Sequence, residues 1–190
     1  LGLETDYGLN PSHISMRNSN AFPEGSIAWR EYLRDSDMVQ FDLQGKSILD
    51  IAGGPVSLLL RCKNFKRAVV VDPLNVPIAV KERYLKHGIE LVQQPMEEYI
   101  YDQHWDEIWD YNVLTHVMDP KKIIIDAREH CNRLRMFEVV DTPITLDHPH
   151  TITNKFLTEN AGDGRTVQLS GNPWPSPSGL AYYNYTSLNN

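Results

Sequence analysis

The middle of the chain alternates between short apolar runs and stretches with a helical spacing of apolar residues. Five of the runs have the length and composition of buried strands: residues 47–52 (SILDIA), 68–72 (AVVVD), 89–93 (IELVQ), 105–111 (WDEIWDY) and 134–140 (LRMFEVV). The stretches between them predict helices at 56–62, at 76–87 and from Pro120, where Asp119 is the cap. Strands that alternate with helices in this way predict an α/β fold with a doubly wound, mostly parallel sheet.

The two ends of the chain have different patterns. Residues 1–25 are rich in Asn, Ser, Gly and Pro and precede a short predicted helix with Trp29 and Tyr32 on its apolar face. After the fifth strand, the pattern predicts a helix at 153–160 and two late strands at 165–169 and 180–188. No repeat or linker divides the chain, so we expect one domain over 1–190, with 1–44 as an N-terminal arm and helix and 45–190 as the α/β core.

Charge and composition narrow the choice of partners. The formal net charge is -7, which gives no electrostatic footprint for DNA or RNA, so we expect no nucleic-acid partner. No apolar run approaches the roughly 20 residues of a membrane helix, and no signal segment opens the chain, so we expect a cytoplasmic protein without a membrane partner. The only cysteines, Cys62 and Cys131, are too few for a disulfide framework and are interpreted as packing thiols.

The loop after the first strand is the first candidate for a ligand site. In an open parallel sheet, ligands bind beyond the carboxyl ends of the strands, and here the small residues 52–54 let the backbone approach a ligand closely. Asp72 ends the second strand about 20 residues later, where a carboxylate can accept hydrogen bonds from both ribose hydroxyls. A tight turn without ligand and an aspartate that opens a turn before Pro73 are the structural alternatives. Together the two elements favour an adenosine-containing cofactor.

At this point the sequence resembles a known family. The segments ILDIAGGPVSLLL, VVVDPL, QQPMEEY and WDEIWDYNVLTHVMDPKKII are similar, in order and spacing, to those of class I S-adenosylmethionine-dependent methyltransferases. The most specific is the strand-four pattern FDxxxxxxVLxHVxDP, found here over 105–120, and the resemblance extends from Gly45 to about Gly162. It implies a seven-stranded, Rossmann-like sheet with a C-terminal antiparallel hairpin. Ala52 and Val56 stand where the family usually has glycine.

The resemblance also implies a cofactor site. S-adenosylmethionine would be bound, with S-adenosylhomocysteine as product, by a set of residues in the loops after strands one to four: Asp50, Ala52, Gly53, Gly54, Pro55, Asp72, Pro73, Leu74, Met96, Glu97, Asn112 and Val113. The methionine end would lie at 50–55, the ribose at Asp72, adenine between Leu74 and the 96–97 segment, and the sulfonium at 112–113.

Methyl transfer to a hydroxyl needs alignment and one base, and histidine titrates near neutrality. His116 follows strand four, and His148 and His150 follow strand five with Asp141 and Asp147 nearby, so these three histidines are the catalytic candidates. In the family that the sequence resembles, a histidine at the position of His116 often has a packing role. The structural alternative for His148 and His150 is a turn with two solvent-exposed histidines. The paired acidic ligands of metal-dependent catechol methyltransferases are not evident, so we expect no metal.

The acceptor is only coarsely indicated. Acidic charge and the lack of an inserted substrate domain favour a small molecule, methylated on a hydroxyl oxygen, with Trp29, Arg30 and Tyr32 as candidate acceptor contacts or as packing for their helix. A cofactor-binding protein without turnover and a purely structural partner protein stay open. An NAD-dependent sugar-modifying enzyme is a further alternative, although the GxGxxG fingerprint is absent. The oligomeric state is not indicated.

Overall fold

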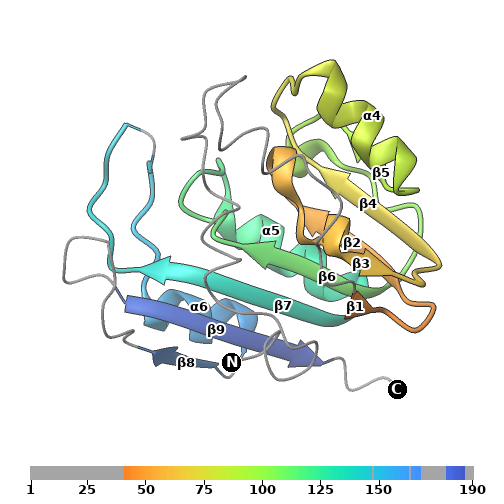
Figure 1. The fold of residues 1–190 in the computed structure, drawn as a ribbon. Coiled ribbons are helices and arrows are strands. Elements are labelled where there is room, and N and C mark those ends of the chain that lie inside the picture. The colour runs from red at the N-terminus through yellow and green to blue at the C-terminus, as the bar shows by residue number, and fades with distance from the viewer. Residues whose placement is uncertain (1–40, 147, 163, 168–178, 187–190) are drawn as a thin grey trace.

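Figure 1 shows the fold of the chain as a computed structural model, with the element labels used below. The structure describes residues 41–186 except 147, 163 and 168–178; within 164–167 and 179–186 it describes the backbone alone. The predicted N-terminal arm and helix, with Trp29, Arg30 and Tyr32, therefore lie outside the described residues, as does Asp147. The single-domain assignment over 1–190 stays a prediction.

The described strands form one large sheet in the order β5-β4-β2-β6-β7-β9-β8. Their bounds are β2 Ser47–Ile51, β4 Arg67–Val71, β5 Glu90–Val92, β6 Trp105–Tyr111, β7 Cys131–Val140, β8 Gly164–Val167 and β9 Gly179–Thr186. Strands β5, β4, β2, β6 and β7 pair in parallel, whereas β9 pairs antiparallel with both β7 and β8. The short strands β1 (Phe41–Asp42) and β3 (Cys62–Lys63) form a separate parallel pair. The predicted α/β class and its five parallel strands are confirmed.

The helices begin and end where the sequence provides the signals. α4 covers Ile78–Lys86, α5 covers Pro120–Glu129 and α6 covers Asn154–Ala161. The Asp119 side chain accepts a hydrogen bond from the Lys122 amide at 2.9 Å, which confirms the predicted cap of α5. Gly88 follows α4 with a φ of 70°, a conformation that glycine adopts without steric cost. No helix among the described residues is long and apolar enough to cross a bilayer.

The helix predicted at 56–62 is wrong. The chain there forms two 3-10 turns, η2 (Gly54–Val56) and η3 (Leu58–Arg61), and then enters β3. Pro55 stands at the start of η2, and the three consecutive leucines of η3, Leu58 to Leu60, are all buried. An α-helix that packs on a sheet buries only one of its faces. The burial of three adjacent residues therefore fits a short 3-10 turn that is buried on all sides better than it fits an amphipathic helix.

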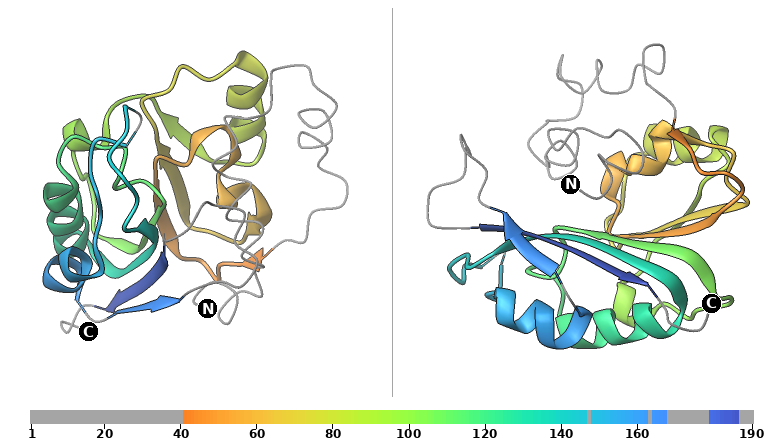
Figure 2. Two further views of the ribbon diagram at one scale, coloured as in Figure 1. Left: turned by 90° about the vertical axis from the view of Figure 1, so that its left-hand side faces the viewer. Right: turned by 90° about the horizontal axis from the view of Figure 1, so that it is seen from below.

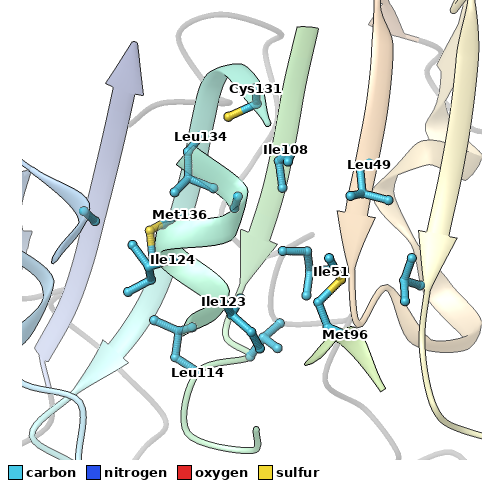
Figure 3. Close-up of a cluster of buried hydrophobic side chains, with 14 of the residues drawn as sticks. Leu49, Ile51, Met96, Ile108, Leu114, Ile123, Ile124, Cys131, Leu134 and Met136 are labelled. Atoms are coloured by element: carbon cyan, nitrogen blue, oxygen red, sulfur yellow. The ribbon is translucent and has the colours of Figure 1, made fainter. Parts of the chain in front are cut away.

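Two apolar clusters cover the two faces of the sheet. One contains the inward residues of α5 and α6, and the other contains those of α4 and η3. Figure 2 shows α4 on the opposite side of the sheet from α5 and α6. Figure 3 shows the first cluster, in which side chains from β2, β6 and β7 meet α5 and two residues from connecting segments, Met96 and Leu114. The labelled side chains of the strands and of α5 are Leu49, Ile51, Ile108, Ile123, Ile124, Cys131, Leu134 and Met136. Burial of both faces confirms the doubly wound architecture.

Candidate active site

Three parallel strands end at one edge of the sheet and place the predicted cofactor loops side by side. Ile51, the last residue of β2, pairs with Val71 of β4 on one side and with Asp110 of β6 on the other. The glycine loop after β2 therefore lies between the loop that begins at Asp72 and the loop that begins at Asn112. In the sheet, β2 lies between β4 on one side and β6 on the other. The chain therefore continues to opposite sides of β2, which makes this edge the topological switch point of the sheet, where ligands of such folds bind.

Asp72 is tied to the glycine loop. Its side chain is 3% exposed, Oδ2 accepts a hydrogen bond from the Gly54 amide at 2.8 Å, and Oδ1 accepts one from the Leu74 amide at 2.8 Å. The carboxylate thus fixes the relative position of the loops after β2 and β4. A carboxylate oxygen has two lone-pair sites, so it can accept more than one hydrogen bond.

The glycine loop is packed tightly at Gly53 and less tightly at Gly54. Asp50 is fully buried and its Oδ2 accepts a hydrogen bond from the Ser57 hydroxyl at 2.6 Å. A Cβ at Gly53 would lie 2.6 Å from that same Oδ2 and 2.7 Å from Val70 Cγ1, so only glycine fits. A Cβ at Gly54, in contrast, would meet only Asp72 Oδ2 at 3.9 Å. Gly54 is itself buried, and among the described residues only Asp72 borders the space that a side chain would fill there.

Ala52 adopts a backbone conformation that favours glycine, the residue usual at this position in the family that the sequence resembles. Its φ is 51°, in the left-handed region that is sterically costly for a residue with a Cβ. Its amide donates a hydrogen bond to the Val71 carbonyl at 2.7 Å. The tertiary structure therefore keeps the bend of the loop although the sequence lacks the usual glycine.

Tyr84 is a part of the site that the sequence did not reveal. It lies on α4, is 1% exposed, donates a hydrogen bond from its hydroxyl to the Gly54 carbonyl at 2.6 Å and accepts one from the Ser57 amide at 2.9 Å. The spacing of Val80 and Tyr84 predicts that both face the sheet. The contact of the hydroxyl with the glycine loop depends on how α4 crosses the sheet, which no local pattern encodes.

The predicted adenine contacts are partly engaged within the protein. Met96 begins η4 (Met96–Glu98) and is buried in the cluster around Ile51, whereas Glu97 Oε1 accepts a hydrogen bond from the Met118 amide at 2.8 Å. Glu97 thus joins η4 to the loop after β6. Leu74 is 47% exposed at the same edge. Contact of these residues with adenine stays a prediction.

The loop after β6 turns sharply at Asn112. Its φ is 58°, and its amide donates a hydrogen bond to the Phe137 carbonyl of β7 at 2.6 Å. Asparagine tolerates this left-handed conformation better than most residues. The next amide, that of Val113, donates to Glu138 Oε1 at 2.9 Å. The predicted sulfonium segment is therefore held by β7.

The predicted catalytic histidines of two separate loops come together. The rings of His116, after β6, and His148, after β7, have centroids 4.4 Å apart and a tilt of 46°. His150 is half-buried two residues beyond His148. The loop 141–152, which projects beyond the end of β7 in Figure 1, is closed at its base by a hydrogen bond from the Asp141 amide to the Ile152 carbonyl at 2.8 Å.

Among the described residues, the orienting partner of His148 is the hydroxyl of Thr145. Thr145 Oγ1 lies 3.0 Å from His148 Nδ1 and accepts a hydrogen bond from the His148 amide at 3.1 Å. These bonds fix the ring in a tight turn at the tip of the loop. With Nδ1 engaged, Nε2 is the ring nitrogen that can face a ligand. Among the described residues, no group of three His, Cys, Asp or Glu side chains is placed to hold a metal ion.

No protein-family model matches the chain, and no curated protein matches its sequence. Solved structures match it in three dimensions. A methyltransferase from Clostridium acetobutylicum that depends on S-adenosylmethionine is 12% identical, with a TM-score of 0.56 over 92% of this chain and 96% of that one. The N-methyltransferase NodS from Bradyrhizobium japonicum, in complex with S-adenosyl-L-homocysteine, is 16% identical, with a TM-score of 0.56 over 91% and 96%. The chain has the fold of class I S-adenosylmethionine-dependent methyltransferases.

The methyltransferase fold alone does not determine the reaction. The [4+2]-cyclase SpnF is 19% identical to the chain, with a TM-score of 0.54 over 65% of this chain. The match covers 54% of SpnF, so the chain spans about half of its length. One fold supports different chemistries, so the reaction depends on the residues at the carboxyl edge of the sheet.

Proposed function

We propose that the protein binds S-adenosylmethionine at the carboxyl edge of the sheet and transfers its methyl group to a hydroxyl oxygen of a small-molecule acceptor. The observation that carries this proposal is the placement of three elements at one edge: the Asp72 carboxylate, the uncrowded Cα of Gly54 and the paired rings of His116 and His148. The first two suit a nucleoside cofactor, and the third supplies a base beside it.

The residues present fit the cofactor. Gly54 leaves space for close approach, since a Cβ there would meet only one atom, at 3.9 Å. The Asp72 carboxylate would accept from the ribose hydroxyls, and Leu74 would pack on the adenine ring. Asp50 would act from beneath the loop, because its carboxylate is buried and bonded to Ser57. The turn at Asn112 and Val113 would border the sulfonium.

The chain's own contribution to the chemistry is alignment and proton removal. Bound S-adenosylmethionine supplies a methyl group that is already activated by the sulfonium. The acceptor oxygen forms a bond to the methyl carbon while the carbon–sulfur bond breaks and its electron pair stays on sulfur. His148 Nε2 takes the hydroxyl proton, with the ring oriented by Thr145 and packed against His116.

The test of the proposal is calorimetric titration with S-adenosylhomocysteine and, in parallel, with NAD. We expect saturable binding of the first ligand, no binding of the second, and a higher melting temperature with S-adenosylhomocysteine, because a ligand that binds only the folded state stabilises it. A screen of hydroxylated metabolites with methyl-labelled cofactor then identifies the acceptor. Binding without transfer to any acceptor would indicate a cofactor-binding protein, and binding of NAD alone would overturn the proposal.

Asp72→Asn is expected to weaken binding of S-adenosylhomocysteine by about 1–3 kcal/mol, the range for hydrogen bonds that involve a charged group. Asparagine keeps one acceptor oxygen for the Gly54 or Leu74 amide but loses the charge and the second acceptor. Dissociation constants from calorimetry measure the effect.

The matched control for this change is Asp106→Asn. Asp106 Oδ2 accepts hydrogen bonds from the Ser47 amide and hydroxyl, both at 2.8 Å, at the opposite, amino-terminal edge of the same strands. This variant should lose stability but retain its affinity for the ligand. Equal affinities of Asp72→Asn and the parent protein would remove Asp72 from the site.

A further inference from the structure

Two acidic side chains are buried side by side on the sheet without an obvious structural purpose. Glu138 of β7 is 0% exposed and Asp110 of β6 is 1% exposed. In the register of the two strands, Asp110 pairs with Met136. Glu138 is two residues further along β7 and therefore lies on the same face of the sheet as Asp110. Burial of carboxyl groups is costly unless they are bonded or neutral. The pair therefore requires an explanation.

The contacts of Glu138 point to the loop after β6. Its Oε1 accepts a hydrogen bond from the Val113 amide at 2.9 Å, and its other oxygen, Oε2, is buried without a donor in the part of the chain that the structure describes. Asp110 lies on the same face of the adjacent strand, and hydrogen bonding between the two carboxyl groups is one cause of a raised pKa of Glu138. Two carboxylates cannot donate to each other, so a bond between them requires a proton.

The surroundings favour that proton on Glu138. Burial, and then the negative charge and hydrogen bond of Asp110, raise the pKa of Glu138 well above its usual value of 4.5. Among the described residues, Asp110 on β6 is the charged group that faces it. As a neutral acid, Glu138 can accept from Val113 through one oxygen and donate to Asp110 through the other.

We propose that Glu138 is a positioning residue: by accepting a hydrogen bond from the Val113 amide, it holds the Asn112–Val113 turn in the shape that receives the sulfonium end of the cofactor. The inference rests on the proposed function. The turn benefits from such support because Asn112 has a φ of 58°, a conformation that is uncommon for any residue other than glycine, although asparagine tolerates it better than most. The hydrogen bond from the Asn112 amide to Phe137 is one link to β7, and Glu138 provides the second.

The deciding comparison is between Glu138→Gln and Glu138→Met. Glutamine accepts from Val113 and donates to Asp110, so its dissociation constant for S-adenosylhomocysteine should stay within about threefold of the parent value. Methionine has a similar volume but leaves the Val113 amide unpaired, and we expect its affinity to fall by about tenfold to a hundredfold. Calorimetric titration well below the melting temperature separates affinity from stability. If Glu138→Met does not fold, Glu138→Asp, which is one methylene shorter, takes its place with the same expected loss.

The control is Glu107→Gln, a second buried glutamate of the same sheet whose side chain bonds Arg135 and Trp109. It should destabilise the protein without changing the affinity. The raised pKa of Glu138 also predicts a pH dependence. As the pH rises above 4.5, the free energy of unfolding of the parent should fall relative to that of Glu138→Gln, because the folded parent keeps a proton on Glu138 that the unfolded parent has lost.

The outcomes separate this inference from the proposed function. A parent protein that binds no S-adenosylhomocysteine overturns both. A parent that binds, together with parental affinity in Glu138→Met or Glu138→Asp, overturns the inference alone. A loss of tenfold or more in Glu138→Gln as well, in a folded protein, would show that an uncharged side chain of this shape is insufficient, and it would also overturn the inference.

Discussion

Replacement of His148 by alanine is expected to lower methyl-transfer turnover by about a hundredfold to ten-thousandfold, the usual contribution of a general base. The ring has one nitrogen bonded to Thr145 and lies against His116, so it is oriented before a ligand arrives. The base acts on the acceptor hydroxyl and not on the cofactor, so the dissociation constant for S-adenosylhomocysteine should stay close to that of the parent. Turnover is measured with methyl-labelled cofactor and the acceptor found by screening.

The neighbouring histidines provide a graded comparison. His116→Ala should reduce turnover less than His148→Ala, because it removes a packing partner of the base. His104, which lies at the amino-terminal edge with Nε2 3.0 Å from Asn132 Oδ1, is the matched control, and His104→Ala should retain parental turnover. If His148→Ala and His150→Ala, singly and together, retain turnover within a few-fold of the parent, the loop after β7 does not supply the base and His116 becomes the candidate.

Arg135→Met should lower the free energy of unfolding by about 3–5 kcal/mol, the cost of leaving one buried charge without its partner. Arg135 is fully buried, and its Nε donates to Glu107 Oε2 at 2.6 Å. The same glutamate also accepts from Lys46 Nζ at 2.8 Å and from Trp109 Nε1 at 3.0 Å. Lys46 remains in the variant, but its side chain is one-third exposed and cannot replace a fully buried guanidinium. Urea denaturation at neutral pH measures the loss.

The pH dependence of this variant supplies an independent check. Burial raises the pKa of Glu107, but the hydrogen bond and charge of Arg135, followed by the hydrogen bonds of Lys46 and Trp109, outweigh it and hold the pKa at about 2. A carboxylate with a lowered pKa stabilises the fold fully above its unfolded value of 4.5, and this stability is lost as the pH falls toward 2. Arg135→Met should weaken that dependence.

The double variant Arg135→Met with Glu107→Leu should recover much of the lost stability, because apolar replacement of both partners leaves no isolated buried charge. A single Arg135→Met variant with parental stability would contradict the role assigned to the buried ion pair.

The sequence by itself determined the class of fold and the edge of the sheet that carries the site. Apolar runs of strand length, separated by helical periods and by signals such as Asp119 and Gly88, are local features, and apart from the segment 56–62 the elements that they predict among the described residues are observed. Parallel strands joined by helices must have all their carboxyl ends at one edge, so the loops after β2, β4, β6 and β7 could be grouped before any contact was known. The tertiary structure corrected one element, the segment 56–62, in which every leucine is buried and no polar face marks a helix.

The partners of individual side chains were decided only by the tertiary structure. The Tyr84 hydroxyl bonds the glycine loop and Glu138 bonds the Val113 amide, because the fold brings together residues that are far apart in the sequence. Thr145 orients His148 because the loop after β7 forms a tight turn between them. A residue pattern has the period of its own helix or strand and contains no information on the neighbour across the sheet. The positive φ of Ala52 is the clearest case: its own side chain disfavours that conformation, and the hydrogen bonds and packing of the assembled edge maintain it.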